Sequence, residues 1–203
     1  MTTQIYTFKI TYADCENKIW RIAEVSVNNT LAQLGYMVLA TFDTMAYHLF
    51  NMECKGITYF LIEDEFVDLR RDRLFDLLSK NRLKTTINKI GEHIKMTYDM
   101  GCEQDFDIEL ISISDMLKEQ RMAYPRIIDG AGQGIIDDMH AFDLLELIHR
   151  IDETGISDVC YDSSGNSDDK LWDYRNYNFD TDNRTLKGKI RLIRAGFEEY
   201  DDE

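Results

Sequence analysis

The sequence predicts an α+β protein: a mainly antiparallel sheet of about six strands with helices packed on one face. Two patterns carry this prediction. Apolar and polar residues alternate over several short runs, as in half-buried strands, whereas apolar residues recur every three to four positions elsewhere, as in amphipathic helices. With 203 residues, 44% of them hydrophobic, the chain is long enough for one sizeable core. We therefore expect a single domain over 1–203, in which 157–203 is a more divergent acidic extension ending in a last helix.

The strongest signal lies in the stretch 94–113. Apolar residues alternate with polar ones over 94–100 and again over 106–110, and a five-residue connection containing one glycine, 101–105, separates the two runs. This pattern is typical of two antiparallel strands joined by a short turn. We expect the rest of the sheet to be arranged around this hairpin.

The other elements follow from the same two periodicities. Strands are expected over 5–12, 19–27, 45–54 and 57–62. Helices are expected over 31–41 and 139–154, with one or two short helices within 63–89 and a last helix through 186–197, capped by Asp182 or Asn183. The segment 124–134 holds the only proline and three glycines, which indicates a loop. Its glycine spacing does not fit a phosphate-binding motif.

The charge of the chain restricts its partners. There are 38 acidic and 23 basic residues, which give a formal net charge of -15. Such a surface repels phosphate backbones, so it argues against direct nucleic-acid binding unless a local basic patch dominates. The one basic patch recognised in the sequence, 70–89, has acidic neighbours and is interpreted as an ion-paired solvent face. Acidity favours a basic or nucleic-acid-binding protein partner, a metal ion or simple solubility.

The cysteines and the hydropathy indicate a cytoplasmic protein. The four cysteines are scattered without a CxxC pair or a zinc-site spacing, so we expect reduced thiols. The N-terminus lacks a basic segment followed by an apolar run, and no apolar stretch approaches 18 residues. We expect no membrane association, and the sequence carries no signal for an oligomeric state.

A set of polar residues forms the candidate site if the strand ends and the glycine segment meet at one end of the sheet. Carboxylates with one or two imidazoles suit a divalent metal such as Mg²⁺ or Mn²⁺, and no other cofactor is expected. Each residue also has a structural interpretation: a turn cap for Asp99, a strand position for His48, and a helix N-terminus for the Asp137–Asp138 pair. The candidates are His48, Asp99, Asp129, Asp137, Asp138 and His140.

A second candidate region is the polar, acidic segment 157–183, which contains several aromatic residues. Trp172, Tyr174 and Tyr177, set among aspartates, form a candidate interaction surface. The alternative is that they are ordinary anchors for a surface segment.

Several landmarks resemble one family in combination. They are Tyr6 to Ile10, Trp20-Arg21, Thr30-Leu31 with Leu34, His48-Leu49-Phe50, Tyr98-Asp99-Met100-Gly101 and Tyr124 to Gly130. In this order they resemble the plasmid pRiA4b ORF-3-like family, also labelled as TnpR-type passenger proteins of insertion elements, over about 4–153 and more loosely to Leu192. The family's Tyr-Asp-Phe-Gly-Asp signature reads Tyr98 to Cys102 here, so part of its polar pattern is absent. The resemblance implies association with mobile DNA and does not imply resolvase chemistry.

Two classes of function follow. The first is a non-catalytic interaction protein of mobile-element or phage origin, whose acidic surface engages a basic or nucleic-acid-binding protein. The second is a divalent-metal-dependent enzyme acting on a nucleotide or nucleic acid, centred on the polar residues given above. The sequence favours the first class and assigns no catalytic residue.

Overall fold

The computed structural model describes residues 3–13, 15, 18–62, 74–116, 123–159 and 171–199. Within these residues, eight strands form one sheet in the order β5-β4-β3-β6-β7-β1-β2-β8, and there are four helices. Neighbouring strands are antiparallel except β4 and β5, which run parallel. The α+β class and the mainly antiparallel sheet are confirmed. The expected number of strands, about six, is wrong because two further segments join the two ends of the sheet.

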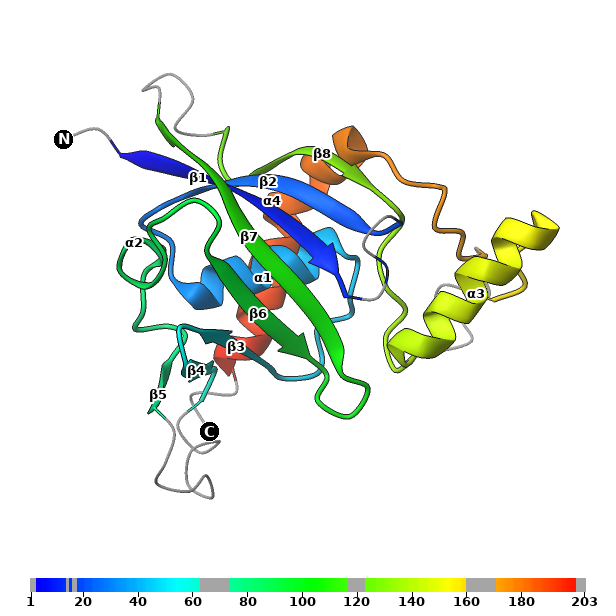
Figure 1. Cartoon of the computed structure of the whole chain (residues 1–203), viewed down its shortest axis with the longest axis horizontal. Helices are drawn as coiled ribbons and strands as arrows, with labels where there is room; N and C mark the ends of the chain where they lie inside the picture. Colours follow the sequence, from blue (N-terminus) through cyan, green and yellow to red (C-terminus); the bar gives the residue numbers. More distant parts are fainter. Residues whose placement is uncertain are drawn as a thin grey trace.

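The central hairpin is confirmed (Figure 1). β6 (His93–Tyr98) pairs antiparallel with β7 (Gln104–Asp115), with Ile94 opposite Ile108 and Met96 opposite Phe106. These four apolar side chains are fully buried, which fixes the register because a slip by one residue would turn them to the opposite face. On the far side of β7 lie β1 (Gln4–Tyr12) and then β2 (Trp20–Ser26), as a second hairpin.

The strands beyond β6 differ from the expectation. β3 (Phe50–Cys54) and β4 (Ile57–Phe60) form the expected pair, but β3 begins only at Phe50, so 45–49 is a loop. Residues 63–73, which include part of the predicted basic patch, lie outside the described residues. The expected helix is wrong for 74–77, which form the strand β5 (Leu74–Leu77). It pairs with β4 and is the edge strand on this side of the sheet. A single helical turn, α2 (Leu83–Thr86), follows.

Within the proline- and glycine-containing segment 124–134, residues 126–131 form a strand, so the expectation of a loop is wrong for these residues. β8 (Arg126–Ala131) pairs with β2. Its outward edge is covered by Asn183, whose side-chain amide nitrogen donates to the Ile127 carbonyl (2.7 Å) and whose Oδ1 accepts from the Ile127 N–H (2.8 Å). Beyond β8, Gly132 (φ 76°) packs so closely that a Cβ would lie 2.1 Å from the Lys18 carbonyl oxygen.

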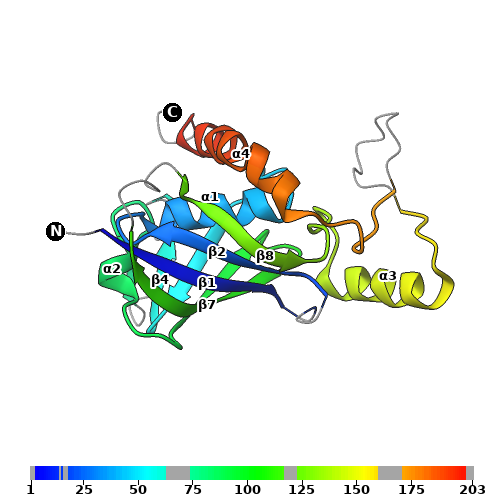
Figure 2. The same ribbon diagram turned by 90° about the horizontal axis from the view of Figure 1, so that it is seen from above.

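Two helices lie in successive layers on one face of the sheet (Figure 2). α1 (Leu31–Thr41) begins with a capping box between Thr30 and Gln33, and ten of its eleven residues are buried because it lies between the sheet and α4 (Phe179–Glu199). The cap expected at Asp182 or Asn183 is wrong. The helix starts earlier, and Asn178 Oδ1 accepts from the Thr181 N–H.

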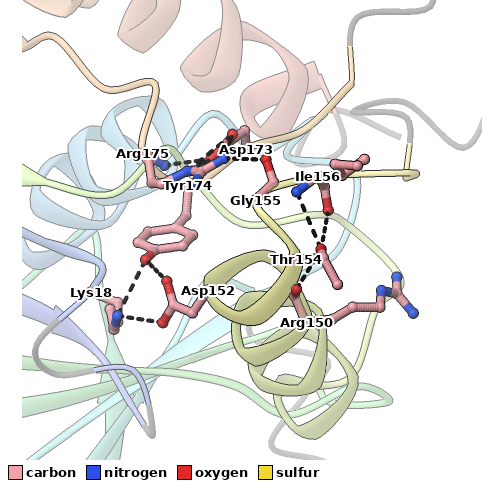
Figure 3. A network of polar contacts seen from close by, with 9 residues as sticks. All are labelled: Lys18, Arg150, Asp152, Thr154, Gly155, Ile156, Asp173, Tyr174 and Arg175. Carbon is pink, nitrogen blue, oxygen red and sulfur yellow. Dashed lines mark hydrogen bonds and ion pairs between the residues drawn. The ribbon is translucent and has the colours of Figure 1, made fainter.

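The third long helix, α3 (Ala141–Thr154), stands at one end of the sheet (Figure 2). Polar contacts hold its C-terminal half (Figure 3): Asp152 accepts a hydrogen bond from Lys18 Nζ (2.7 Å) and another from the Tyr174 hydroxyl. Arg175 donates to the carbonyl of Gly155, the left-handed residue that ends the helix (3.0 Å). These contacts tie the C-terminal half of α3 to Lys18, which precedes β2, and to the segment that leads into α4. None of the helices in the described ranges has the length and apolar character needed to span a membrane.

Candidate metal centre

Three segments that are distant in the sequence meet beside the tip of the central hairpin. They are the loop 45–49 before β3, the turn 99–103 between β6 and β7, and the segment 135–140 between β8 and α3. Two of the aspartates in these segments, Asp99 (φ 51°) and Asp138 (φ 60°), have left-handed backbone conformations. Such conformations are uncommon for residues other than glycine and often occur at functional sites.

Asp99 has two distinct oxygens. Oδ1 accepts from the backbone N–H groups of Gly101 (3.1 Å) and Cys102 (3.3 Å), so it caps the turn as its structural interpretation predicts. Oδ2 is buried, makes no hydrogen bond and lies 3.6 Å from His48 Nε2. The residue as a whole is only 6% exposed. One carboxylate oxygen therefore builds the turn, and the other is directed at His48.

His48 lies between two carboxylates. Its Nε2 lies 2.8 Å from Asp138 Oδ1 as well as 3.6 Å from Asp99 Oδ2. Asp138 also accepts a hydrogen bond from the Tyr47 hydroxyl. The hydrogen bonds from Tyr47 and His48 lower the pKa of Asp138, and the same bond to Asp138 raises the pKa of Tyr47. His48 Nε2 and one oxygen each of Asp99 and Asp138 lie within 4.8 Å of one another.

Asp137 supports this cluster without facing it. Its Oδ2 accepts from the Met45 N–H (2.8 Å), and its Oδ1 accepts from the Tyr98 hydroxyl (2.7 Å). Partial burial raises the pKa of Asp137, and burial together with the negative charge of Asp137 raises the pKa of Tyr98. Asp137 thus ties the loop that carries His48 to the end of β6.

The two remaining candidates lie elsewhere. Asp129 is in β8 opposite Ile22, exposed, with its own Oδ1 accepting from the Gly130 N–H (2.8 Å). His140 is the exposed N-cap residue of α3, and its side chain makes no capping bond. Neither belongs to the group of close ligand atoms. The expectation that all six residues converge is wrong for these two.

The predicted aromatic surface is largely inaccessible. Trp172 is fully buried and donates its indole N–H to the Gly134 carbonyl (2.9 Å), and Tyr174 is 9% exposed. Tyr177 is half-buried and lies with its ring 3.6 Å from the Arg21 guanidinium. The prediction that these rings form an exposed surface is therefore wrong. The three rings anchor the C-terminal segment to the body, which is the alternative that the sequence left open.

Sequence reasoning missed the two tyrosines of the site. Tyr47 and Tyr98 each directly precede a predicted site residue, His48 and Asp99, and each hydroxyl donates to one aspartate of the 137–138 pair. The sequence did contain a signal for them, because His48 and Asp99 each directly follow a tyrosine. The pair itself lies before the first turn of α3 and makes these bonds, so it does not act as a helix cap.

The donor set suits a divalent cation. One imidazole nitrogen and two carboxylate oxygens are typical ligands for first-row metals. The side chain of Asp138 is 51% exposed and that of His48 31%, so solvent has access to one side of the cluster. His48, Asp99 and Asp138 would hold such an ion, and binding would replace the direct contact between His48 Nε2 and Asp138.

The fold and the cluster together define a class: an α+β protein with an open, mainly antiparallel sheet and a histidine–carboxylate centre beside the tip of its central hairpin. The chain belongs to the plasmid pRiA4b ORF-3-like protein family, whose model matches residues 4–183. This match includes all residues of the cluster and extends beyond the region of clear motif resemblance, 4–153.

The fold is similar to that of a solved structure. It is the crystal structure of a protein of unknown function, MM3350, from Methanosarcina mazei Go1. The two chains are 18% identical, with a TM-score of 0.63, and the similarity covers 76% of this chain and 85% of the archaeal one. At this identity the likeness concerns the fold alone. No curated protein matches the sequence of the chain.

Proposed function

We propose that the protein binds a divalent cation through His48, Asp99 and Asp138 and uses it in a reaction on a nucleotide or nucleic acid. The observation that carries this proposal is Asp99 Oδ2, a buried carboxylate oxygen without a hydrogen bond. A carboxylate oxygen removed from water without a hydrogen bond is costly, and native structures rarely keep one without a functional reason. A cation placed between Oδ2, His48 Nε2 and Asp138 would offset that cost.

The donors favour manganese over magnesium. Mg²⁺ prefers oxygen ligands and retains much of its water, whereas a site with an imidazole suits the transition metals. Three protein ligands with one accessible side also leave coordination positions open, which is the arrangement of catalytic rather than structural centres. Mn²⁺ is therefore the first ion to test.

The residues of the site would have different roles around a bound ion. His48, Asp99 and Asp138 hold it, and Tyr47 orients Asp138 by donating to its second oxygen. Asp137 and Tyr98 keep the 45–49 loop in place. When bound, a divalent ion supplies charge neutralisation for phosphate oxygens and lowers the pKa of a bound water. This chemistry is the reason for proposing a phosphate-containing substrate.

The test is a Mn²⁺ titration followed by thermal melting. At a metal concentration of about a hundred times Kd, the wild type is expected to gain roughly 5–10 °C in Tm, because the ion binds only the folded state. Asp99→Asn is expected to abolish the gain. Asparagine keeps the Oδ1 acceptor that caps the turn and replaces the ligand oxygen, Oδ2, by an amide NH₂.

Asp129→Asn is the matched control, since Asp129 also accepts from a following backbone N–H but lies outside the cluster. It should retain the full metal-induced shift. A wild type without a saturable shift, or an equal shift in Asp99→Asn, would show that the cluster is not a metal site.

The interaction protein is the second candidate, and α3 favours it. This helix stands at one end of the sheet and has exposed acidic residues, Asp143, Glu146 and Glu153. Next to them, Phe142 is 67% exposed. An apolar side chain beside carboxylates suits a basic protein partner, which is the kind of partner that the net charge of -15 favours.

This candidate predicts charge-dependent capture by α3. A basic cellular protein should be captured by the immobilised wild type at low salt and released at high salt. The triple variant Asp143→Asn/Glu146→Gln/Glu153→Gln should lose the capture, whereas Asp129→Asn should keep it. Equal capture by the triple variant would place the contact elsewhere and reject α3 as the interaction surface.

A further inference from the structure

The middle of α4 is strongly basic in an otherwise acidic protein. The stretch 184–194, RTLKGKIRLIR, contains five basic residues and no acidic one, whereas the whole chain has a net charge of -15. This run differs from the basic patch at 70–89, which is interleaved with acidic residues. Its basic residues are Arg184, Lys187, Lys189, Arg191 and Arg194.

Helix geometry sorts these residues by face. With 100° per residue, Arg184, Gly188, Arg191 and Ala195 fall on one side of α4, with Lys187 and Arg194 along its border. The opposite side packs on the core through Leu186, Ile190, Ile193 and Phe197. Because α4 is the outermost layer over α1, its basic side faces away from the body of the protein (Figure 2).

Two arginines on this side, Arg184 and Arg191, carry charges that are available to a partner. Lys189 lies outside this side and bonds to Asp43. Arg184 and Arg191 are exposed, and neither makes a hydrogen bond or an ion pair with any residue that the structure describes. Arg194 pairs with Glu198 (2.7 Å), but both side chains are 52% exposed, so the pair is weak and exchangeable.

A glycine lies in the middle of this side. Gly188 is exposed, and a Cβ placed on it would meet no atom within 4 Å. Interior glycine weakens a helix relative to alanine, and no contact within the described chain requires it here. Its effect is to let another backbone approach the helix closely between Arg184 and Arg191.

We propose that this side of α4 binds the phosphate backbone of a nucleic acid without sequence preference. Arg184 and Arg191 are two turns apart, roughly 10 Å, which spans a few successive phosphates of one strand. Three of the four basic residues on this side are arginines, whose guanidinium fork matches phosphate geometry. The acidic charge elsewhere is screened beyond about 10 Å at 0.1 M salt, so the local positive field governs contact at α4. The proposal does not depend on the metal centre.

The test is fluorescence anisotropy with labelled duplex DNA, single-stranded DNA and RNA of random sequence, in EDTA, over a series of salt concentrations. The wild type should bind at low salt and weaken steeply as salt rises. Arg184→Gln/Arg191→Gln should weaken binding at least tenfold and reduce the slope of log Kd against log salt by roughly 1.4 for single strands to 1.8 for duplex DNA. Glutamine is a good helix former, so the helix should persist, and a thermal melt confirms folding.

Arg82→Gln is the matched control, because Arg82 is an exposed arginine of another element. It should leave affinity and slope unchanged. Three results would overturn the proposal: no oligonucleotide binding at low salt, equal binding by the double variant, or binding of polyglutamate in place of the oligonucleotides. The last result would identify an acidic protein segment as the occupant. Loss of metal binding in Asp99→Asn with retained oligonucleotide binding would separate this surface from the metal centre.

Discussion

Arg21→Leu is expected to lower the free energy of unfolding by about 3–5 kcal/mol, because it leaves buried carbonyl groups without their hydrogen-bond donor. The Arg21 side chain is fully buried. Its Nε donates to the Thr41 carbonyl (3.1 Å), and its Nη1 donates to the carbonyls of Trp20 (2.9 Å) and Ala131 (2.8 Å). These three acceptors belong to the end of α1, β2 and β8, so one guanidinium joins three elements.

Urea unfolding of the wild type and the variant measures this effect. Arg21→Lys should fall between them, because an ammonium keeps the charge but cannot reproduce the planar fork or the stacking on Tyr177. Arg82→Leu, at an exposed position, should change stability by less than about 0.5 kcal/mol. A loss below about 1 kcal/mol in Arg21→Leu would mean that these hydrogen bonds contribute little.

Gly134→Ala should cost about 3 kcal/mol or more, because there is no space for a methyl group. A Cβ on Gly134 would lie 1.9 Å from the Phe42 carbonyl oxygen and 2.4 Å from its carbon. The backbone cannot easily move away, since Ile135 N–H donates to that same oxygen (2.9 Å) and Trp172 donates to the Gly134 carbonyl (2.9 Å).

Gly188→Ala is the contrasting change for this prediction. Its Cβ meets nothing within 4 Å, so alanine should be neutral or should stabilise α4 by up to about 1 kcal/mol. Thermal or urea unfolding of both variants gives the comparison. If the two substitutions had equal effects, close backbone packing at Gly134 would not be a determinant of stability.

Local patterns predicted the elements whose partners are near in sequence. The β6–β7 hairpin, the β1–β2 pair, α1 and α3 have clear periodicity, caps or turns, and the structure confirms them. β5 and β8 were missed because distant pairing determines their conformation. β8 contains a glycine and follows the only proline, and it becomes a strand because it pairs with β2 and because Asn183 satisfies its outer edge.

The sequence predicted the residues that form the cluster, but not which of the other candidates lie outside it. Asp99 and His48 lie at adjacent ends of β6 and β3, and the antiparallel pairing of these strands, with Phe50 opposite Tyr98, brings them close together. Alternation predicts the two strands but not their pairing. Asp138 joins them because the segment after β8 crosses to the same place, and no local pattern reveals that crossing. Asp129 precedes the crossing and His140 follows it, which explains why neither joins the cluster.

The basic side of α4 was missed for a different reason. Hydrophobic periodicity predicted the helix, but the net charge of -15 favoured an acidic binding surface. A count of charge per helix face would have separated 184–194 from the mixed run at 70–89. Charge placement on a face, rather than net charge, is the quantity that determines local recognition.

The contact between Asn183 and Ile127 also bears on solubility. An unprotected sheet edge is a template onto which a strand from another molecule can add, and repeated addition leads to aggregation. Here a single side-chain amide occupies both the N–H and the C=O of Ile127, as a neighbouring strand would. Through Asn183, α4 therefore covers the β8 edge at Ile127, where a strand of another copy could otherwise pair.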